Sequence, residues 1–254
     1  MPGANTSTWI TGIEERRQKL SEIVERTRPV TLAGERVLPV LPSLRTLFPD
    51  GGLLRGSTVA VDGGCGATSL ALAVTAAASR AGSWVAVVGL SDLGLAAVGE
   101  LGVDLHRIAV ITPIRSSWAT VVAALIDAFD LVVVAPSHAV RATQARRLAA
   151  RARERGTVLL NVPGRLQDRA RRWPEEVDLR LTVSAVAWEG LARGYGHLRT
   201  RRLTVQATGR RKASRPRRAD LWLVDADEGV ISMEPPREQE SSRDPEVAPL
   251  RRVG

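Results

Sequence analysis

Short apolar runs alternate along this chain with longer stretches whose apolar residues recur at helical spacing. The runs predict strands at 58–61, 84–88, 107–111, 131–134 and 157–162. The stretches between them predict helices at 68–80, 95–101, 118–129 and 139–155. Several runs carry no charged residue, which is typical of strands covered on both faces. The alternation therefore predicts βαβ units and a parallel sheet.

The pattern changes after Asp178. The segments 179–188, 196–207 and 220–224 follow one another as strands, with turns and no helix between them. Strands joined by short turns pair antiparallel. We therefore predict an α/β fold with three layers, in which antiparallel C-terminal strands extend a mainly parallel central sheet.

Both ends of the chain differ from this central part. Apolar residues at helical spacing predict an amphipathic helix at 9–26, and three prolines predict an extended linker or an edge segment at 29–43 rather than a helix. A short helix is expected within 44–54, stopped by Pro49. Residues 234–254 are rich in proline, charge and serine and predict a disordered tail. The expected division is 1–43 for the helix and linker, 44–233 for the core domain and 234–254 for the tail.

The charge balance is strongly basic, with a formal net charge of +9. Nearly all of it is arginine, and such a charge favours polyanions, acidic protein surfaces or anionic membranes as partners. Cys65 is the single cysteine, so an internal disulfide and a cysteine-based metal cluster are excluded. A signal peptide and an apolar run of about 20 residues are both lacking. We expect a cytoplasmic protein without membrane contact.

A glycine turn joins the first predicted core strand to the first predicted helix. Its sequence is Gly63-Gly64-Cys65-Gly66-Ala67-Thr68-Ser69. A strand, a glycine-rich turn and a helix are the layout of a phosphate-binding P-loop, whose pattern is G-x-x-x-x-G-K-[ST]. Here Ala67 stands where the lysine belongs, and the loop is about two residues short of the pattern. Two readings stay open: a residual anion site that uses the Thr68 and Ser69 hydroxyls, or a tight turn with Thr68 or a neighbour as helix cap. We favour the tight turn.

The succession of motifs resembles the RecA recombinase core. The matching pieces are a glycine turn before the first strand (47–56), the second strand (87–92) and an "LGVD" segment (101–104). A Walker B-like strand (129–135), the strand after it (157–162) and a late basic strand (201–205) follow in the same order. The resemblance covers about 44–232. It implies a RecA-like fold of the P-loop NTPase type.

Three departures from the RecA pattern fall on three separate catalytic roles. Ala67 replaces the P-loop lysine, and Ala135 replaces the Walker B aspartate that helps to hold Mg²⁺. The catalytic glutamate position falls on Ser91, or on Asp92 if the alignment slips by one residue. We therefore predict no enzyme activity, no cofactor and no metal, with a vestigial P-loop at Gly63, Gly64, Gly66, Ala67, Thr68 and Ser69.

An arginine-rich, degenerate RecA-like chain of this length is similar to the actinobacterial ImuA-type proteins. That resemblance implies an accessory factor in DNA-damage-induced (SOS) translesion synthesis and mutagenesis. The implied partners are an ImuB-like inactive Y-family polymerase protein and, as further candidates, RecA, an error-prone C-family polymerase and DNA. Two alternatives stay open: an ATP-dependent recombinase-type DNA-binding ATPase, and an inhibitor of cell division like SulA, another degenerate RecA-like protein.

The basic residues gather in two clusters. Residues 141–172 hold ten arginines, and residues 193–218 hold ten basic residues without any acidic one. In recombinases the loops after the fourth and fifth strands face DNA, so both clusters are candidates for DNA contact and imply nucleoid association. The run 210–218 is expected to be a mobile, solvated hairpin loop. An acidic protein partner and a merely solvated face are the other readings. The candidate contact residues are Arg146, Arg147, Arg151, Arg199, Arg201, Arg202, Arg210, Arg211, Lys212, Arg215, Arg217 and Arg218.

Overall fold

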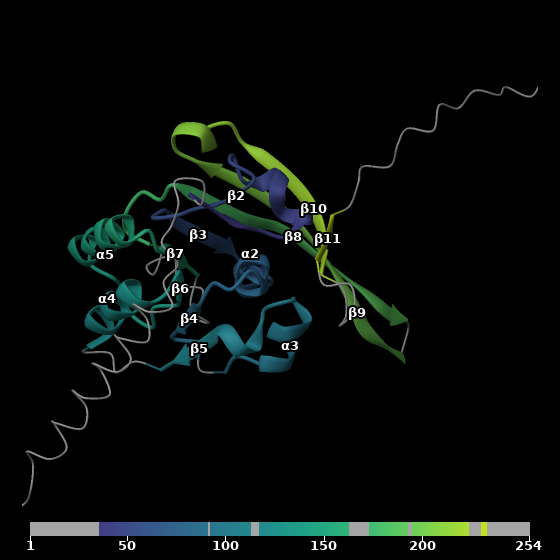
Figure 1. Cartoon of the computed structure of the whole chain (residues 1–254). Coiled ribbons are helices and arrows are strands. Elements are labelled where there is room, and N and C mark those ends of the chain that lie inside the picture. Colours follow the sequence, from purple (N-terminus) through teal and green to yellow (C-terminus); the bar gives the residue numbers. More distant parts are fainter. Residues whose placement is uncertain are drawn as a thin grey trace, which may run out of the picture.

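A nine-stranded mixed sheet forms the centre of the computed structural model, with helices on both faces (Figure 1). The structure describes residues 36–90, 92–112, 117–162, 173–192, 195–223 and 230–232, with the backbone alone at 185, 188–200 and 231–232. The predicted helix at 9–26 and the predicted tail at 234–254 lie outside the described residues.

The strands of this sheet follow the order β11-β10-β9-β8-β3-β7-β6-β4-β5. Their bounds are β3 (Thr58–Gly63), β4 (Val85–Val88), β5 (Ile108–Ile111), β6 (Leu131–Val134), β7 (Val158–Asn161), β8 (Leu179–Ala192), β9 (Tyr195–Gly209), β10 (Arg217–Leu223) and β11 (Val230–Ser232). The strands from β8 to β5 in this order pair in parallel. The pairs β8–β9, β9–β10 and β10–β11 are antiparallel. The prediction of a mainly parallel sheet with an antiparallel extension is confirmed.

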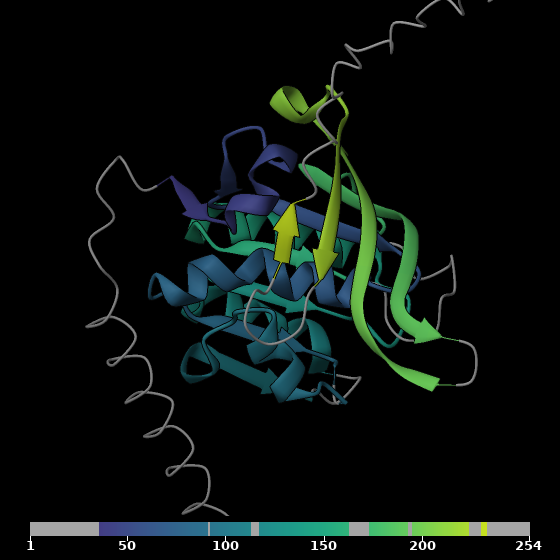
Figure 2. The same cartoon turned by 90° about the vertical axis from the view of Figure 1, so that its right-hand side faces the viewer.

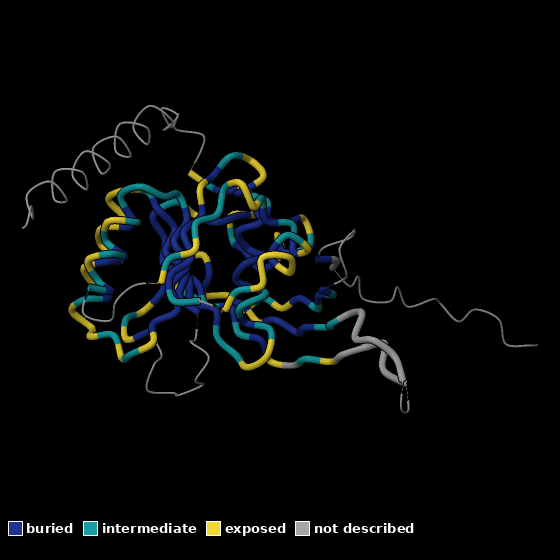
Figure 3. Tube along the Cα trace, turned by 90° about the horizontal axis from the view of Figure 1, so that it is seen from below, coloured by how far each residue is buried: buried dark blue, intermediate teal, exposed yellow. Residues whose placement is uncertain are grey.

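Helices cover the parallel strands on both sides. The helices α2 (Ala67–Arg80) and α3 (Leu95–Glu100) contribute to one apolar core, and α4 (Trp118–Ala128) and α5 (Ala142–Arg155) contribute to the other. Successive residues of β6 alternate between the two cores, which explains why this strand is an unbroken apolar run. Figure 3 shows the buried strands enclosed by partly exposed helices and loops.

The packed structure begins earlier than the predicted boundary at residue 44. The strand β1 (Val37–Pro39) pairs antiparallel with β2 (Gly52–Leu54), and a 3₁₀ helix, η1 (Pro42–Leu47), lies between them. The prolines do keep residues 37–41 from forming an α-helix, and Val37–Pro39 forms a short strand, as expected for an edge segment rather than for a linker. The short helix expected to stop at Pro49 is present as the 3₁₀ helix η1, which ends at Leu47.

The β8–β9 hairpin is longer than predicted and extends beyond the neighbouring strands of the sheet. The pairing of β8 with β3 ends at Val183, and the pairing of β9 with β10 reaches only to Arg201. Beyond these points β8 and β9 continue as a two-stranded ribbon that projects from the sheet (Figure 2). The strand β11, three residues long, was not predicted at all. The turn expected around Asp225, Asp227 and Glu228 lies outside the described residues.

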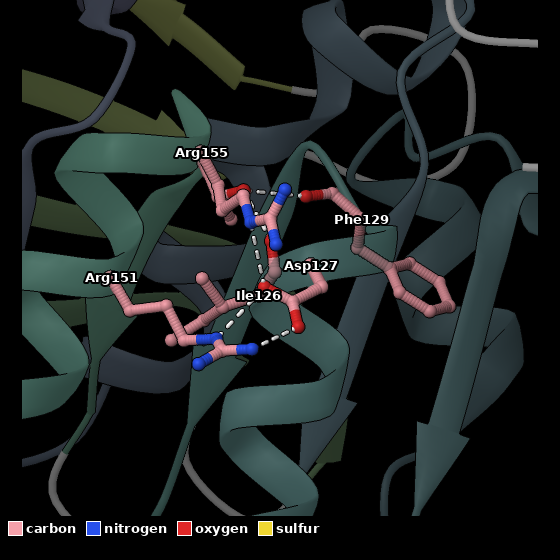
Figure 4. Close-up of polar contacts among 6 residues, drawn as sticks. Ile126, Asp127, Phe129, Arg151 and Arg155 are labelled. Atoms are coloured by element: carbon pink, nitrogen blue, oxygen red, sulfur yellow. Dashed lines mark hydrogen bonds and ion pairs between the residues drawn. The ribbon is translucent and has the colours of Figure 1, made fainter. Parts of the chain in front are cut away.

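An ion-pair cluster fastens α5 to α4 (Figure 4). The Asp127 carboxylate accepts hydrogen bonds from the guanidinium groups of Arg151 and Arg155. The hydrogen bond from Arg151 holds the pKa of Asp127 below its usual range, although partial burial opposes this shift. Below this pair, the Thr157 hydroxyl donates to the carbonyls of Ile126 (2.7 Å) and Phe129 (2.9 Å). The cluster therefore fixes the C-terminal half of the arginine-rich helix against the neighbouring helix.

Asp127→Asn should lower the free energy of unfolding by about 0.5–1 kcal/mol at pH 7, because the pair lies at the surface. The folded-state pKa of Asp127 is lowered, so its contribution is present above the unfolded-state pKa and is lost as the pH falls through the folded-state value. Urea unfolding at pH 7 and pH 3 measures this. Glu100→Gln, at an exposed acidic residue on α3, is the control. An equal effect of Asp127→Asn at both pH values would contradict the prediction.

Candidate functional site

The glycine turn lies where predicted, between the carboxyl end of β3 and the first residue of α2. Its backbone uses left-handed conformations, with φ at +119° for Gly63 and +101° for Gly66. Gly66 is the N-cap residue of α2 and no side chain caps the helix, so the proposed hydroxyl cap from Thr68 is absent. The backbone thus requires glycine at two positions of the turn.

Two strands of the antiparallel extension press against this turn. A Cβ atom on Gly63 would lie 2.7 Å from the carbonyl oxygen of Val183 in β8, and one on Gly66 would lie 2.8 Å from a terminal methyl of Leu203 in β9. Leu203 is fully buried. The turn is therefore packed from the sheet side by apolar side chains and by backbone. These contacts support the reading as a tight turn over that of an anion site.

The two positions that would carry nucleotide chemistry are part of the apolar core. Ala67 is 2% exposed and Ala135, directly after β6, is 1% exposed, and both belong to the same buried cluster as α2. A Cβ atom on Gly89 would meet the Ala135 carbonyl oxygen at 2.3 Å, so the segments after β4 and β6 are in close contact. A lysine or a carboxylate at these places would have to enter an apolar environment. Ser91 lies outside the described residues, and Asp92 is exposed.

Asn161 is a polar residue at this edge of the sheet that sequence reasoning missed. It ends β7, the strand between β3 and β6, and pairs with Ala60 on one side and Val134 on the other. Its side chain is 2% exposed, and its Oδ1 atom accepts no hydrogen bond. The signal in the sequence was an amide that closes an otherwise apolar run. Asn161 therefore places a buried amide at the carboxyl end of the strand between β3 and β6.

The first arginine cluster lies on α5 and is partly neutralised. Arg151 pairs with Asp127, and Arg146 pairs with Glu175 at 2.9 Å. Arg147 and Arg153 are exposed and have no acidic partner among the described residues. The part of this cluster between 163 and 172 lies outside the described residues.

The second cluster is divided between β9 and the loop that follows it. Arg201 and Arg202 lie on β9, while the run 210–218 joins β9 to β10 and contains a 3₁₀ helix, η5 (Arg211–Ala213). The pairing of Leu179 with Gly209 puts this loop at the amino end of the parallel strands, opposite to the glycine turn. The loop is a hairpin loop as predicted, but it does not lie at the edge where the fourth and fifth strands end.

Arg201 is the predicted contact residue that lies beside the glycine turn. Burial of its guanidinium lowers its pKa below the usual arginine value, and the nearby Cys65 thiol opposes this shift. The side chain of Arg199 is not described. The structure therefore brings one predicted arginine to the turn and places the basic run 210–218 elsewhere.

Metal and membrane chemistry receive no support from the described residues. Within them, no three histidine, cysteine, aspartate or glutamate side chains gather as a metal ion requires. His106 is exposed, and His138 contacts the ring of Trp118 edge-on at 5.4 Å. The same part of the chain contains no helix with the length and apolar character needed to cross a membrane.

Comparison with known proteins places this geometry in a family. The profile of the MT3502 N-terminal domain matches residues 46–172. The chain belongs to this family. It is also 37% identical over 149 residues to "Uncharacterized protein Rv3395c" of Mycobacterium tuberculosis (strain ATCC 25618 / H37Rv), an alignment that covers 57% of this chain and 71% of that protein. The MT3502 N-terminal domain includes the glycine turn, Ala135 and α5. The strands β8 to β11 and the loop at 210–218 follow the matched segment.

Replacement of Gly63 by alanine should destabilise the fold more than the same change at Gly82. Both glycines have a strongly positive φ, +119° and +102°, but a Cβ atom on Gly82 would meet nothing within 4 Å. Gly82→Ala should cost about 1–2 kcal/mol of backbone strain. Gly63→Ala should cost about 1–3 kcal/mol more, because the new methyl group meets the Val183 backbone. Urea unfolding of both variants measures the difference, and equal losses would show that β8 does not press on the turn.

Proposed function

We propose that this chain is a non-catalytic, RecA-like accessory protein of the ImuA type that acts in DNA-damage-induced translesion synthesis and mutagenesis. The observation that carries the proposal is the burial of Ala67 and Ala135 in one apolar core. The positions of a phosphate-binding lysine and a metal-binding carboxylate have become packing positions. The strand order and the motif order of a nucleotide-binding domain are kept without the charged groups that the chemistry uses.

The sheet supports the RecA-like assignment. The segments that resemble the P-loop strand, the second strand, the Walker B strand and the strand beyond it form β3, β4, β6 and β7. These strands are parallel neighbours, so the glycine turn, Ala135 and Asn161 lie at one edge of the sheet. In open α/β sheets this carboxyl edge is where ligands bind. The turn and the two buried alanines thus occupy the place of a nucleotide site.

In this proposal the protein works by bridging other proteins. An ImuB-like inactive Y-family polymerase protein is the direct partner, and RecA, the error-prone C-family polymerase and DNA are further contacts. The basic character of the chain, with a pI of about 11.1, suits acidic protein surfaces and nucleic acid. The proposed location is the cytoplasm, associated with the nucleoid.

Titration of the purified chain with Mg-ATP in a calorimeter should give no binding heat at millimolar nucleotide. The physical reason is that Ala67 supplies no cation to balance the phosphate charge and Ala135 supplies no carboxylate to help hold Mg²⁺. Thr68→Ala should leave the result unchanged. Micromolar affinity that Thr68→Ala abolishes would instead identify a working ATPase of the recombinase type.

Co-expression with the ImuB-like protein of the same organism should yield a complex that survives affinity capture and gel filtration. Deletion of the encoding gene should lower damage-induced mutation frequency to the level of an ImuB-like deletion, and the double deletion should lower it no further. Filamentation on overexpression together with binding to the division GTPase, and without capture of the ImuB-like protein, would support a SulA-like inhibitor and overturn the proposal.

A further inference from the structure

The loop between β9 and β10 is a preformed projection. We call residues 210–218 the basic loop. Its first residue is fixed by a hydrogen bond from the Arg210 amide to the carbonyl of Asp178 (3.1 Å). The η5 turn closes through the Ala213 amide and the Arg210 carbonyl (2.9 Å), and Ala213 itself is buried. Figures 1 and 2 show η5 projecting from the end of the sheet. The loop therefore keeps a defined shape while its cationic side chains face solvent.

Arg211 has an unfavourable backbone conformation. Its φ is +52°, and among the described residues it is the non-glycine with positive φ. An L-residue other than glycine, asparagine or aspartate pays about 1–2 kcal/mol in this region. Glycine or asparagine would fit the turn with less strain. The loop thus holds an arginine at a position where the backbone conformation disfavours it. Such strain is typical of functional positions, so we infer that the Arg211 side chain has a role.

Three of the six cations of the basic loop pair with an acidic residue after folding, and one of these is Arg218, which lies 3.9 Å from Asp220. Lys212 pairs with Asp50 at 2.6 Å, and Arg210 pairs with Glu176 at 3.2 Å. Arg211 and Arg215 are exposed and have no acidic partner among the described residues. Arg217 donates long hydrogen bonds, 3.4 Å each, to two carbonyls of the loop and so supports its shape. Folding therefore leaves a cationic surface that is open to a polyanion.

A hollow of about 260 Å³ lies at the base of the basic loop. It is smaller than the roughly 300–1,000 Å³ typical of sites that enclose a small molecule. Two of its lining arginines are held in place, Arg180 by Asp62 and Arg210 by Glu176. The full lining is Glu176, Val177, Arg180, Thr208, Gly209 and Arg210. Because both arginines are paired with acidic residues and the Glu176 carboxylate lines the hollow, the hollow offers a surface depression and the Thr208 hydroxyl beside the loop, but no unpaired cation.

The surface lacks the apolar anchor that a protein partner would use. None of the exposed large apolar residues of the described chain belongs to the basic loop or lines the hollow; they are Leu54, Trp84, Leu95, Leu105 and Val110. Protein interfaces concentrate their binding energy in buried aromatic and apolar anchors. Contacts to a sugar–phosphate backbone need only cations and hydrogen-bond donors. The composition of the basic loop therefore favours nucleic acid over an acidic protein.

We propose that the basic loop binds the sugar–phosphate backbone of nucleic acid, without reading its sequence, and that the hollow lies beside this contact. This inference deepens the DNA contact in the proposed function and rests on that function for its biological setting. The site lies at the amino ends of the parallel strands, whereas the glycine turn lies at their carboxyl ends. Arg211 and Arg215 make the phosphate contacts, and Arg217 holds the loop in shape.

The test compares two pairs of substitutions that remove the same charge. Arg211→Asn with Arg215→Gln removes two cations from the basic loop, and asparagine tolerates the left-handed backbone at residue 211. Arg147→Gln with Arg153→Gln removes two exposed cations from α5, which likewise have no acidic partner in the described part of the chain. Fluorescence anisotropy measures the affinity of both double variants, as full chains, for a labelled mixed-sequence 20-nucleotide single strand and for its duplex.

Loss of two phosphate contacts should weaken single-strand binding about 20-fold at 0.1 M salt and lower the slope of log K against log salt by about 1.4. The α5 pair should change affinity at most about twofold. Arg211→Lys with Arg215→Lys should retain most of the affinity, and thermal melts by circular dichroism confirm that each variant is folded. If the basic-loop pair weakens binding to either the single strand or the duplex, the result supports the proposal and identifies which form of nucleic acid is bound.

Two results would overturn this inference. Equal losses from the two pairs would mean that net charge alone attracts nucleic acid. Poly-glutamate that binds tighter than DNA, with the same dependence on the basic loop, would assign the surface to an acidic protein. The anisotropy assay contains only this chain and nucleic acid, so a negative result in it does not affect the expected capture of an ImuB-like partner. A failure to capture that partner likewise does not affect the result of the anisotropy assay.

Discussion

The contact between β8 and the glycine turn is the constraint on which the centre of this fold depends. β3 pairs with β7 as far as Ala60 and with β8 as far as Gly63, so its last residues lie directly against β8. At Gly63 the Val183 backbone lies so close that no side chain fits. The chain must turn there with a positive φ and enter α2 without a capping side chain. Glycine satisfies both conditions through its lack of a Cβ atom.

This constraint changes what the glycine motif means. In a P-loop, glycines leave room for a phosphate and let backbone amides reach it. Here the same residue type leaves room for Val183 and Leu203 of the protein itself. Packing of β8 and β9 accounts for the glycines, while the buried alanines at 67 and 135 account for the missing charge. Glycines in a turn between a strand and a helix can thus be required by close packing of the protein itself.

The periodic segments were predictable because they are long and covered on both faces. The strands β3, β4, β6 and β7 and the helices α2, α4 and α5 differ from their predicted bounds by at most about three residues. The register of the paired strands and the close contacts between distant segments were not predictable from the sequence. Nothing in the sequence shows that Val183 meets Gly63, or that 37–39 pairs with 52–54 across a proline-rich stretch. Asn161 was missed for the same reason, since its burial depends on strand order and not on local pattern.

The number of basic residues, ten in each cluster, also proved a poor guide to available charge. Acidic residues draw cations of both clusters into ion pairs, Asp127 and Glu175 on the side of α5 and Asp50, Glu176 and Asp220 at the basic loop. In the basic loop Arg211, whose φ is positive, and Arg215 remain exposed without acidic partners in the described structure, as Arg147 and Arg153 do on α5. The segment of β8 from Leu179 to Val183 separates this loop from the glycine turn by at least about 13 Å, at 3.3 Å per residue. A polyanion bound at the basic loop would therefore lie at the opposite end of the parallel strands from the glycine turn.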